Sequence, residues 1–180
     1  MKGERIFTRD FTLDMMISLC CSLNYFTLLI NITGFAAFRF GSDTAIGGTA
    51  AGIYVIGGLL SRIVAGKYIE MVGRKKMLLI GLSFALVMST TYFFVSSIAM
   101  LMAIRFLHGM SYGISSTCTS DIVAKLLPQS RRGEGLGYFF LSITIACAIG
   151  PLLGMTLGSS QNYDAVFFVG LVMYSLALVM

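Results

Sequence analysis

The sequence predicts an all-α membrane protein, a bundle of six transmembrane helices. Of the 180 residues, 57% are hydrophobic and only 12% are charged, with a mean hydropathy of +0.86. Soluble domains carry about 25% charged residues. The apolar residues form six long runs, and basic residues gather in alternate connections between these runs. This composition excludes a disordered chain, a nucleic-acid-binding domain and a disulfide-rich secreted module.

Each apolar run has about the length of a membrane-spanning helix, which takes about 20 residues. The runs cover residues 11–33, 44–66, 76–95, 98–124, 135–157 and 164–180. The first is too long for the apolar part of a signal peptide, so we expect it to remain as a helix. The last is still apolar at Met180, is slightly short of a full span and has no polar flank. We therefore expect a piece of a longer protein, cut at or near this sixth helix.

Basic residues mark one side of the membrane. That side has Lys2, Arg5 and Arg9 before the first run, Lys67, Arg74, Lys75 and Lys76 after the second, and Lys125, Arg131 and Arg132 after the fourth. The opposite side has only Arg39. Because Lys and Arg concentrate in cytoplasmic loops, the N-terminus and both basic connections are expected to be cytoplasmic. The same pattern accounts for the net charge of +5 without nucleic acid as a partner.

The connection after the second run combines two glycines with charges at a fixed spacing. Gly66 and Gly73 permit a tight turn and the close approach of neighbouring elements. Glu70 and Arg74 are four residues apart, close enough to interact if this segment is helical. Anchoring at the membrane surface would explain Lys75, but it would not explain the glycine spacing.

Three further motifs follow along the chain. They read R-F-L-H-G over residues 105–109, P-Q-S-R-R-G over 128–133 and G-P-L-L-G over 150–154. In the last of these, Gly150 and Gly154 begin a series of small-x-x-x-small steps that ends at Gly158 and favours close helix packing. Pro151 removes one backbone hydrogen bond, which favours a kink.

Together with residues 66–76, these motifs resemble the signatures of the major facilitator superfamily. The signatures are G-x-x-x-D-[RK]-x-G-R-[KR], R-x-x-x-G, P-x-x-x-R-G and the antiporter motif G-P-x-x-G, and here Glu70 replaces the usual aspartate. The resemblance implies that residues 1–180 form the N-terminal six-helix half of a twelve-helix transporter, with the C-terminal bundle absent. It also implies two inverted three-helix repeats, in agreement with the glycine-rich second and fifth runs. In this family the motif at Gly150, Pro151 and Gly154 correlates with export by antiport.

The resemblance also implies a cytoplasmic gate. Its residues are Gly66, Glu70, Gly73, Arg74, Lys75 and Asp121. Glu70 is expected to face the other half of the transporter, and Arg74 is expected to tie the second helix to the fourth. Lys125 stands where many members of the family carry an acid, so Asp121, one turn earlier, is the expected partner of Arg74.

Two polar stripes are expected to line a path for substrate and protons. They consist of Asn24, Thr27 and Asn31 in the first run, and Arg105, His108, Tyr112 and Ser116 in the fourth. Helical periodicity places the members of each stripe on one face, and the resemblance implies that both helices line a central cavity. Alternatively, Arg105 serves a structural network by bonding to the first helix without contacting substrate.

The single histidine and two other ionisable residues have competing interpretations. His108 has an ordinary pKa of about 6.5, which suits a proton carrier, although a buried histidine also serves as a hydrogen-bonded packing residue. Asp14 and Arg62 lie near helix ends, and we expect both to reach the membrane interface.

The expected function is secondary active transport, namely proton-coupled efflux of a small organic compound such as a drug or metabolite. The alternatives are proton-coupled uptake of a sugar or organic acid, and a half-size membrane scaffold without transport activity. The expected partners are the small-molecule substrate, protons, the lipid bilayer and the missing C-terminal half, in the cell membrane. The four cysteines lie in apolar runs without metal-ligand spacing, and the sequence has no nucleophile–base set. We therefore expect no metal, no cofactor and no enzyme activity.

Overall fold

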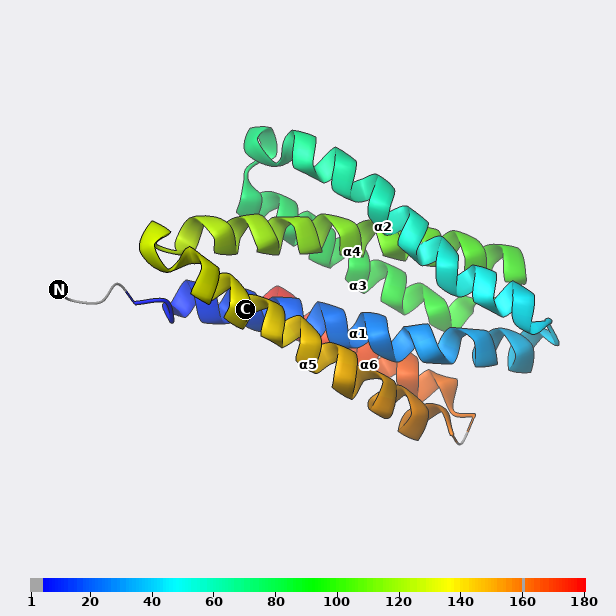
Figure 1. Ribbon diagram of the computed structural model, residues 1–180. Helices are drawn as coiled ribbons and strands as arrows, with labels where there is room; N and C mark the ends of the chain where they lie inside the picture. The colour runs from blue at the N-terminus through cyan, green and yellow to red at the C-terminus, as the bar shows by residue number, and fades with distance from the viewer. Residues whose placement is uncertain (1–4, 160) are drawn as a thin grey trace.

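The computed structural model describes residues 5–159 and 161–180, and this part of the chain is built from helices without strands. The six α-helices are α1 (Arg9–Phe40), α2 (Thr44–Val72), α3 (Arg74–Thr91), α4 (Ile98–Leu126), α5 (Arg132–Gly158) and α6 (Tyr163–Val179). Two short 3₁₀ turns, η1 (Tyr92–Phe94) and η2 (Gln129–Arg131), follow α3 and α4. Figure 1 shows the helices running side by side along one long axis.

Five of the helices are long and apolar enough to cross a membrane, and α6 is a shorter apolar helix of 17 residues. Several helices extend beyond the ends expected from hydropathy, most clearly α1 to Phe40 and α2 to Val72. The extension of α1, residues 34–40, is largely apolar, and that of α2, residues 67–72, mixes charged with apolar side chains, so neither composition interrupts the backbone hydrogen bonding of the helix. Consequently Gly66 and Glu70, expected in a connection, lie inside α2.

Glycines end the first two helices. Gly41 adopts the left-handed conformation with φ 60°, and its N–H donates to the carbonyl of Ala37 at 2.9 Å. Gly73 has φ 90° and separates α2 from α3 without any further loop residue. A residue with a side chain rarely adopts these angles, so both positions favour glycine. The break at Gly73 places Arg74 at the first position of α3.

Close backbone contact joins α2 to α4, which form the most extensive helix pair. A Cβ atom built on Gly109 would lie 2.0 Å from the carbonyl oxygen of Tyr54, and one built on Gly57 would lie 2.2 Å from that of Phe106. Small residues permit this approach, as they do in other membrane helix pairs.

The glycine steps of α5 produce the second extensive pair, with α1. A Cβ atom on Gly150 would lie 2.5 Å from Cβ of Phe26, and one on Gly154 would lie 2.9 Å from the carbonyl oxygen of Thr27. This contact agrees with the close packing expected from the spacing of the glycines. The α-helix continues through Pro151 to Gly158.

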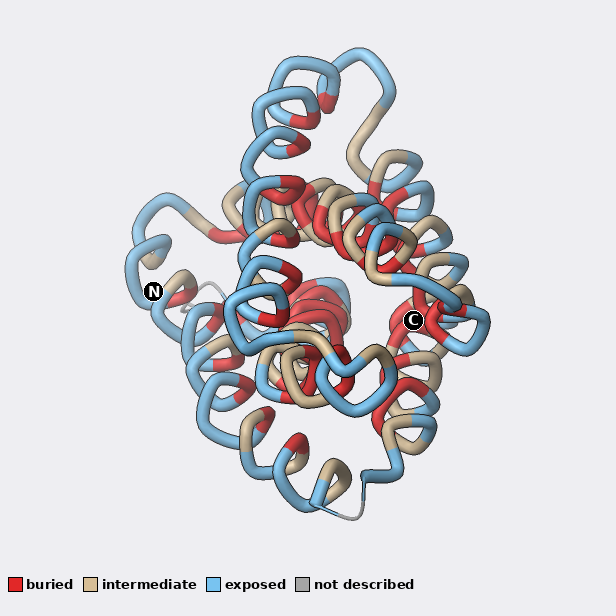
Figure 2. Tube along the Cα trace, turned by 90° about the vertical axis from the view of Figure 1, so that its right-hand side faces the viewer, coloured by how far each residue is buried: buried red, intermediate tan, exposed pale blue. Residues whose placement is uncertain are grey.

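The outer surface of the bundle is apolar. Figure 2 shows the buried residues turned towards the interior and the exposed ones on the outside. In α5, only 22% of the most apolar stretch is buried, and large side chains such as Leu152 and Met155 are exposed. Exposed apolar surface of this extent is typical of helices that contact lipid or another bundle.

Candidate functional site

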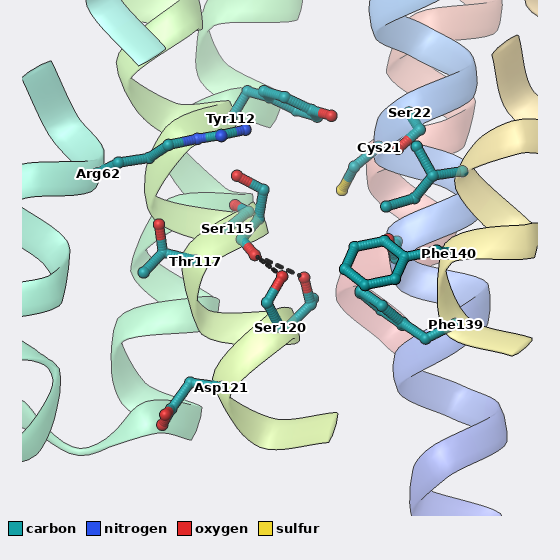
Figure 3. Close-up of a pocket in the computed structure, with 14 residues that line it drawn as sticks. Cys21, Ser22, Arg62, Tyr112, Ser115, Thr117, Ser120, Asp121, Phe139 and Phe140 are labelled. Carbon is teal, nitrogen blue, oxygen red and sulfur yellow. Dashed lines mark hydrogen bonds between the residues drawn. The ribbon is translucent and has the colours of Figure 1, made fainter. Parts of the chain in front are cut away.

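A cavity of 670 Å³ lies between the α2–α4 pair and the α1–α5 pair (Figure 3). Its most frequent groups are hydroxyls. They belong to Ser18, Ser22, Ser115, Ser116, Thr117, Thr119 and Ser120. The rings of Tyr112, Phe139 and Phe140 complete much of the wall. We refer to this space as the hydroxyl-lined cavity. Clefts with apolar walls and a few placed polar groups are typical binding sites for small molecules.

Three tyrosines form a stack beside this cavity, the tyrosine cluster of Tyr25, Tyr54 and Tyr112. The ring centroid of Tyr25 lies 5.2 Å from that of Tyr54 and 5.4 Å from that of Tyr112, both in stacked geometry. The cluster borders a second cavity of 160 Å³. Tyr112 and Arg62 line both cavities, so the two spaces are neighbours.

Arg62 is the functional candidate that sequence reasoning missed. Its exposed side chain extends from α2 towards Tyr112 and lines both cavities, in the space between the helix pairs (Figure 3). The available signal was a cation inside an apolar run. Sequence alone could not show that this face of α2 turns towards α1 rather than towards lipid.

Arg105 is fully buried and bonds to α2, not to α1 as in the structural alternative. Its Nε donates to the carbonyl of Ala50 at 3.0 Å, and its Nη2 donates to that of Ala51 at 3.5 Å. The guanidinium carbon lies 4.3 Å from the ring centroid of Tyr54, in cation–π contact. Its Nη1 atom has no hydrogen-bond partner among the described residues. Arg105 therefore joins α4 to α2 behind the tyrosine cluster and is not a wall of either cavity.

His108 lies away from both cavities, which differs from the expected path. Its Nδ1 is 3.1 Å from the hydroxyl of Tyr92, and its Nε2 is 3.2 Å from the hydroxyl of Tyr174. The ring is fully buried between α4, η1 and α6. Both ring nitrogens are thus engaged by neutral hydroxyls, an arrangement that suits a packing residue.

The polar stripe of α1 also lies outside the cavities. Thr27 donates to the carbonyl of Gly150 at 3.2 Å, and Asn31 donates to that of Thr27 at 2.9 Å. Asn24 packs against Gly170 of α6. Thr27 and Asn31 thus bond to backbone carbonyls of α5 and α1, whereas the Oδ1 atom of Asn24 has no hydrogen-bond partner among the described residues. The stripe faces α5 and α6 and not the hydroxyl-lined cavity. Of the predicted path residues, Tyr112 and Ser116 line the hydroxyl-lined cavity.

Three of the predicted gate residues, Glu70, Arg74 and Asp121, meet at the end of the bundle that carries the α2–α3 and α4–α5 connections, here called the basic end (Figure 1). Arg74 donates from Nε to Asp121 and from Nη2 to Glu70. Lys125 donates to Glu70 at 2.7 Å and lies 3.8 Å from Asp121. We call these four residues the charge cluster.

The charge cluster contains the expected Arg74–Asp121 and Glu70–Arg74 contacts and adds Lys125 as a second partner of Glu70. That carboxylate bonds within this half of the bundle, to Arg74 and Lys125, although 68% of its side chain remains exposed. Gly66 faces open space on α2, and Lys75 is exposed. Two cations alternate with two anions, so the cluster is electrically balanced.

Asp14 is buried, contrary to the expected interfacial position. Only 4% of the residue is exposed, and its Oδ2 atom has no hydrogen-bond partner among the described residues. It borders a cavity of 240 Å³ together with residues of α3, α4 and α6.

Comparison with known proteins gives a consistent result. The family model for the Major Facilitator Superfamily matches residues 15–180. Over 141 residues the chain is 31% identical to "Uncharacterized MFS-type transporter Rv1250" of Mycobacterium tuberculosis, covering 78% of this chain and 24% of that protein. Over 125 residues it is 27% identical to "Multidrug resistance protein 3" of Bacillus subtilis, covering 69% of this chain and 24% of that protein.

A solved structure shows the same fold. The crystal structure of peptide transporter POT in complex with sulfate superposes with a TM-score of 0.86 at 18% identity, covering 95% of this chain and 36% of that one. The chain thus spans about a quarter to a third of the proteins that it matches. The family match over residues 15–180 shows that this chain belongs to the Major Facilitator Superfamily.

Proposed function

We propose that residues 1–180 are the N-terminal half of a secondary transporter that exports a small organic compound in exchange for protons. The observation that carries this proposal is the hydroxyl-lined cavity between two tightly packed helix pairs. In transporters of this kind, one bundle rocks against another around a central binding site. The cavity supplies one wall of such a site, and the absent second bundle would supply the other.

Export is favoured over uptake by two observations. The α5 motif at residues 150–154 resembles the antiporter motif, and its glycines hold α5 against α1 at the wall of the cavity. One relative bears the name of a multidrug resistance protein. We place the complete protein in the cell membrane with the N-terminus and the basic end in the cytoplasm, because Lys and Arg concentrate there.

The charge cluster is proposed as part of the cytoplasmic gate. Arg74 joins the start of α3 to α4 through Asp121 and to α2 through Glu70. Such contacts favour one conformation only if they change when the transporter opens to the other side, because an unchanged contact shifts no equilibrium. We infer that Glu70, the most exposed member, exchanges its partners with the second bundle during this change.

Transport in inside-out membrane vesicles tests the proposal. Vesicles containing the complete protein, with an acidified lumen, are offered a panel of labelled cationic, neutral and anionic organic compounds. Proton exchange predicts accumulation of at least one compound in the lumen, which a protonophore abolishes. Proton symport predicts loss of preloaded compound instead. Vesicles that show no gradient-dependent flux above protein-free controls for any compound would contradict the proposed function.

A further inference from the structure

The charges around the two neighbouring cavities are unbalanced. Arg62 lines both cavities, and within residues 5–159 and 161–180 no carboxylate forms a salt bridge with it. Asp121 lines the lower part of the hydroxyl-lined cavity, but its charge is compensated by Arg74 and Lys125. The uncompensated charge at the tyrosine cluster is therefore positive.

The guanidinium of Arg105 adds to the positive electrostatic potential at the tyrosine cluster. Arg105 is fully buried against Tyr54, donates to the carbonyls of Ala50 and Ala51 and retains an Nη1 atom without a partner among the described residues. Uncompensated charges in a cleft with apolar walls act at longer range than they do in water. Two arginines near the same three rings therefore attract an anion and repel a cation.

The neutral groups indicate what else a ligand carries. Tyr25 and Tyr112 present stacked rings beside Arg62, a surface that suits a flat aromatic ring. Along α4, the hydroxyls of the half-buried Ser116 and Ser120 donate to carbonyls of their own helix at 3.2 and 2.8 Å. Their oxygens consequently remain as acceptors for hydrogen-bond donors of a ligand.

Resting on the transport function proposed above, we infer that this half-site recognises a hydroxylated aromatic carboxylate. Arg62 binds the carboxylate, the ring lies against Tyr25 and Tyr112, and a ligand hydroxyl donates to the serine oxygens of α4. The guanidinium fork matches a carboxylate in two parallel hydrogen bonds. Arg105 acts as a positioning residue, which holds Tyr54 in the stack and adds positive potential.

Binding of three compounds of nearly equal size tests the charge class. They are 4-hydroxyphenylacetate, 4-hydroxyphenylacetamide and tyramine, which are anionic, neutral and cationic. In equilibrium dialysis with the complete purified protein, the acid should bind about tenfold or more tightly than tyramine, as a charge-assisted contact implies. Arg62→Gln should remove this advantage and leave binding of the amide nearly unchanged, while Arg62→Lys should retain part of it.

Lys67→Gln is the matched control. Lys67 is an exposed cation on the same helix and lines neither cavity. Its replacement by glutamine should therefore leave the binding of all three compounds unchanged. Tighter binding of tyramine than of the acid, or no binding of the acid, would overturn the inference. Equal loss of acid binding in Lys67→Gln and Arg62→Gln would overturn it too. Flux of cationic compounds alone in the vesicle assay would retain the proposed transport and reject this substrate class.

Discussion

The ammonium group of Lys125 on α4 lies 2.7 Å from the carboxylate of Glu70 on α2, although 55 positions separate them in the chain. The contact exists because Gly73 ends α2 beside the last turn of α4, and because Arg74 donates to both Glu70 and Asp121 and so holds the two carboxylates close together. A lysine at this position therefore completes a balanced cluster with an acid one turn earlier.

Lys125 should contribute modestly to stability, and the contribution should depend on salt. Its side chain is 48% exposed, and exposed pairs contribute about 0.2–1 kcal/mol. Lys125→Gln should lower the thermal midpoint of the complete protein slightly, and Lys125→Glu should lower it more because three acids would then face Arg74. Lys125→Arg is the control and should preserve the midpoint. At high salt the three variants should converge, since screening weakens exposed pairs; a salt-independent loss would contradict an electrostatic role.

Weakening the charge cluster should favour opening at the basic end. Arg74→Ala removes the contacts with both Asp121 and Glu70, and Glu70→Gln removes one carboxylate charge. A loss of roughly 1 kcal/mol shifts a two-state balance about fivefold. We expect faster labelling of a single cysteine at Ser120, on the cavity wall, together with slower turnover and little change in substrate affinity. Unchanged labelling and full transport in both variants would exclude the gate.

Gly109 should tolerate no side chain. A Cβ atom there would lie 2.0 Å from the Tyr54 carbonyl, so Gly109→Ala must separate α2 from α4. Forcing extra atoms into a packed contact costs roughly 1–3 kcal/mol, which should appear as a clear drop in the thermal midpoint. Gly52→Ala is the matched control, because nothing lies within 4 Å of the added atom. Equal midpoints for the two variants would mean that the helix pair is looser than described.

His108 should act in packing rather than in proton transfer. It holds the hydroxyls of Tyr92 and Tyr174 inside the bundle. His108→Phe leaves both hydroxyls without this partner, and an unsatisfied buried group costs about 1–3 kcal/mol. We expect a lower thermal midpoint and an unchanged pH profile of transport. When His108→Phe is combined with Tyr92→Phe and Tyr174→Phe, the loss of thermal stability should be less than the sum of the separate losses. A flattened pH profile of transport in His108→Gln would contradict this prediction and indicate a role in proton transfer.

The sequence by itself determined the class of fold, because only long apolar runs supply helices that can satisfy their backbone inside a membrane. It also predicted the Arg74–Asp121 contact, since Lys125 occupies the usual position of the acid and Asp121 is one turn away. Likewise, the glycine steps of α5 predicted close packing from their spacing alone. Each of these features depends on residues near one another along the chain or on a recognisable motif.

Only the tertiary structure decided which neighbour each helix face meets. Helical periodicity groups Asn24, Thr27 and Asn31 on one side of α1, but it does not say that α5 and α6 cover that side. For the same reason, only the structure shows that His108 faces α6 and that Arg62 lines the cavity. The azimuth of each helix follows from the summed packing of all its neighbours, and that sum becomes available only when the bundle is assembled.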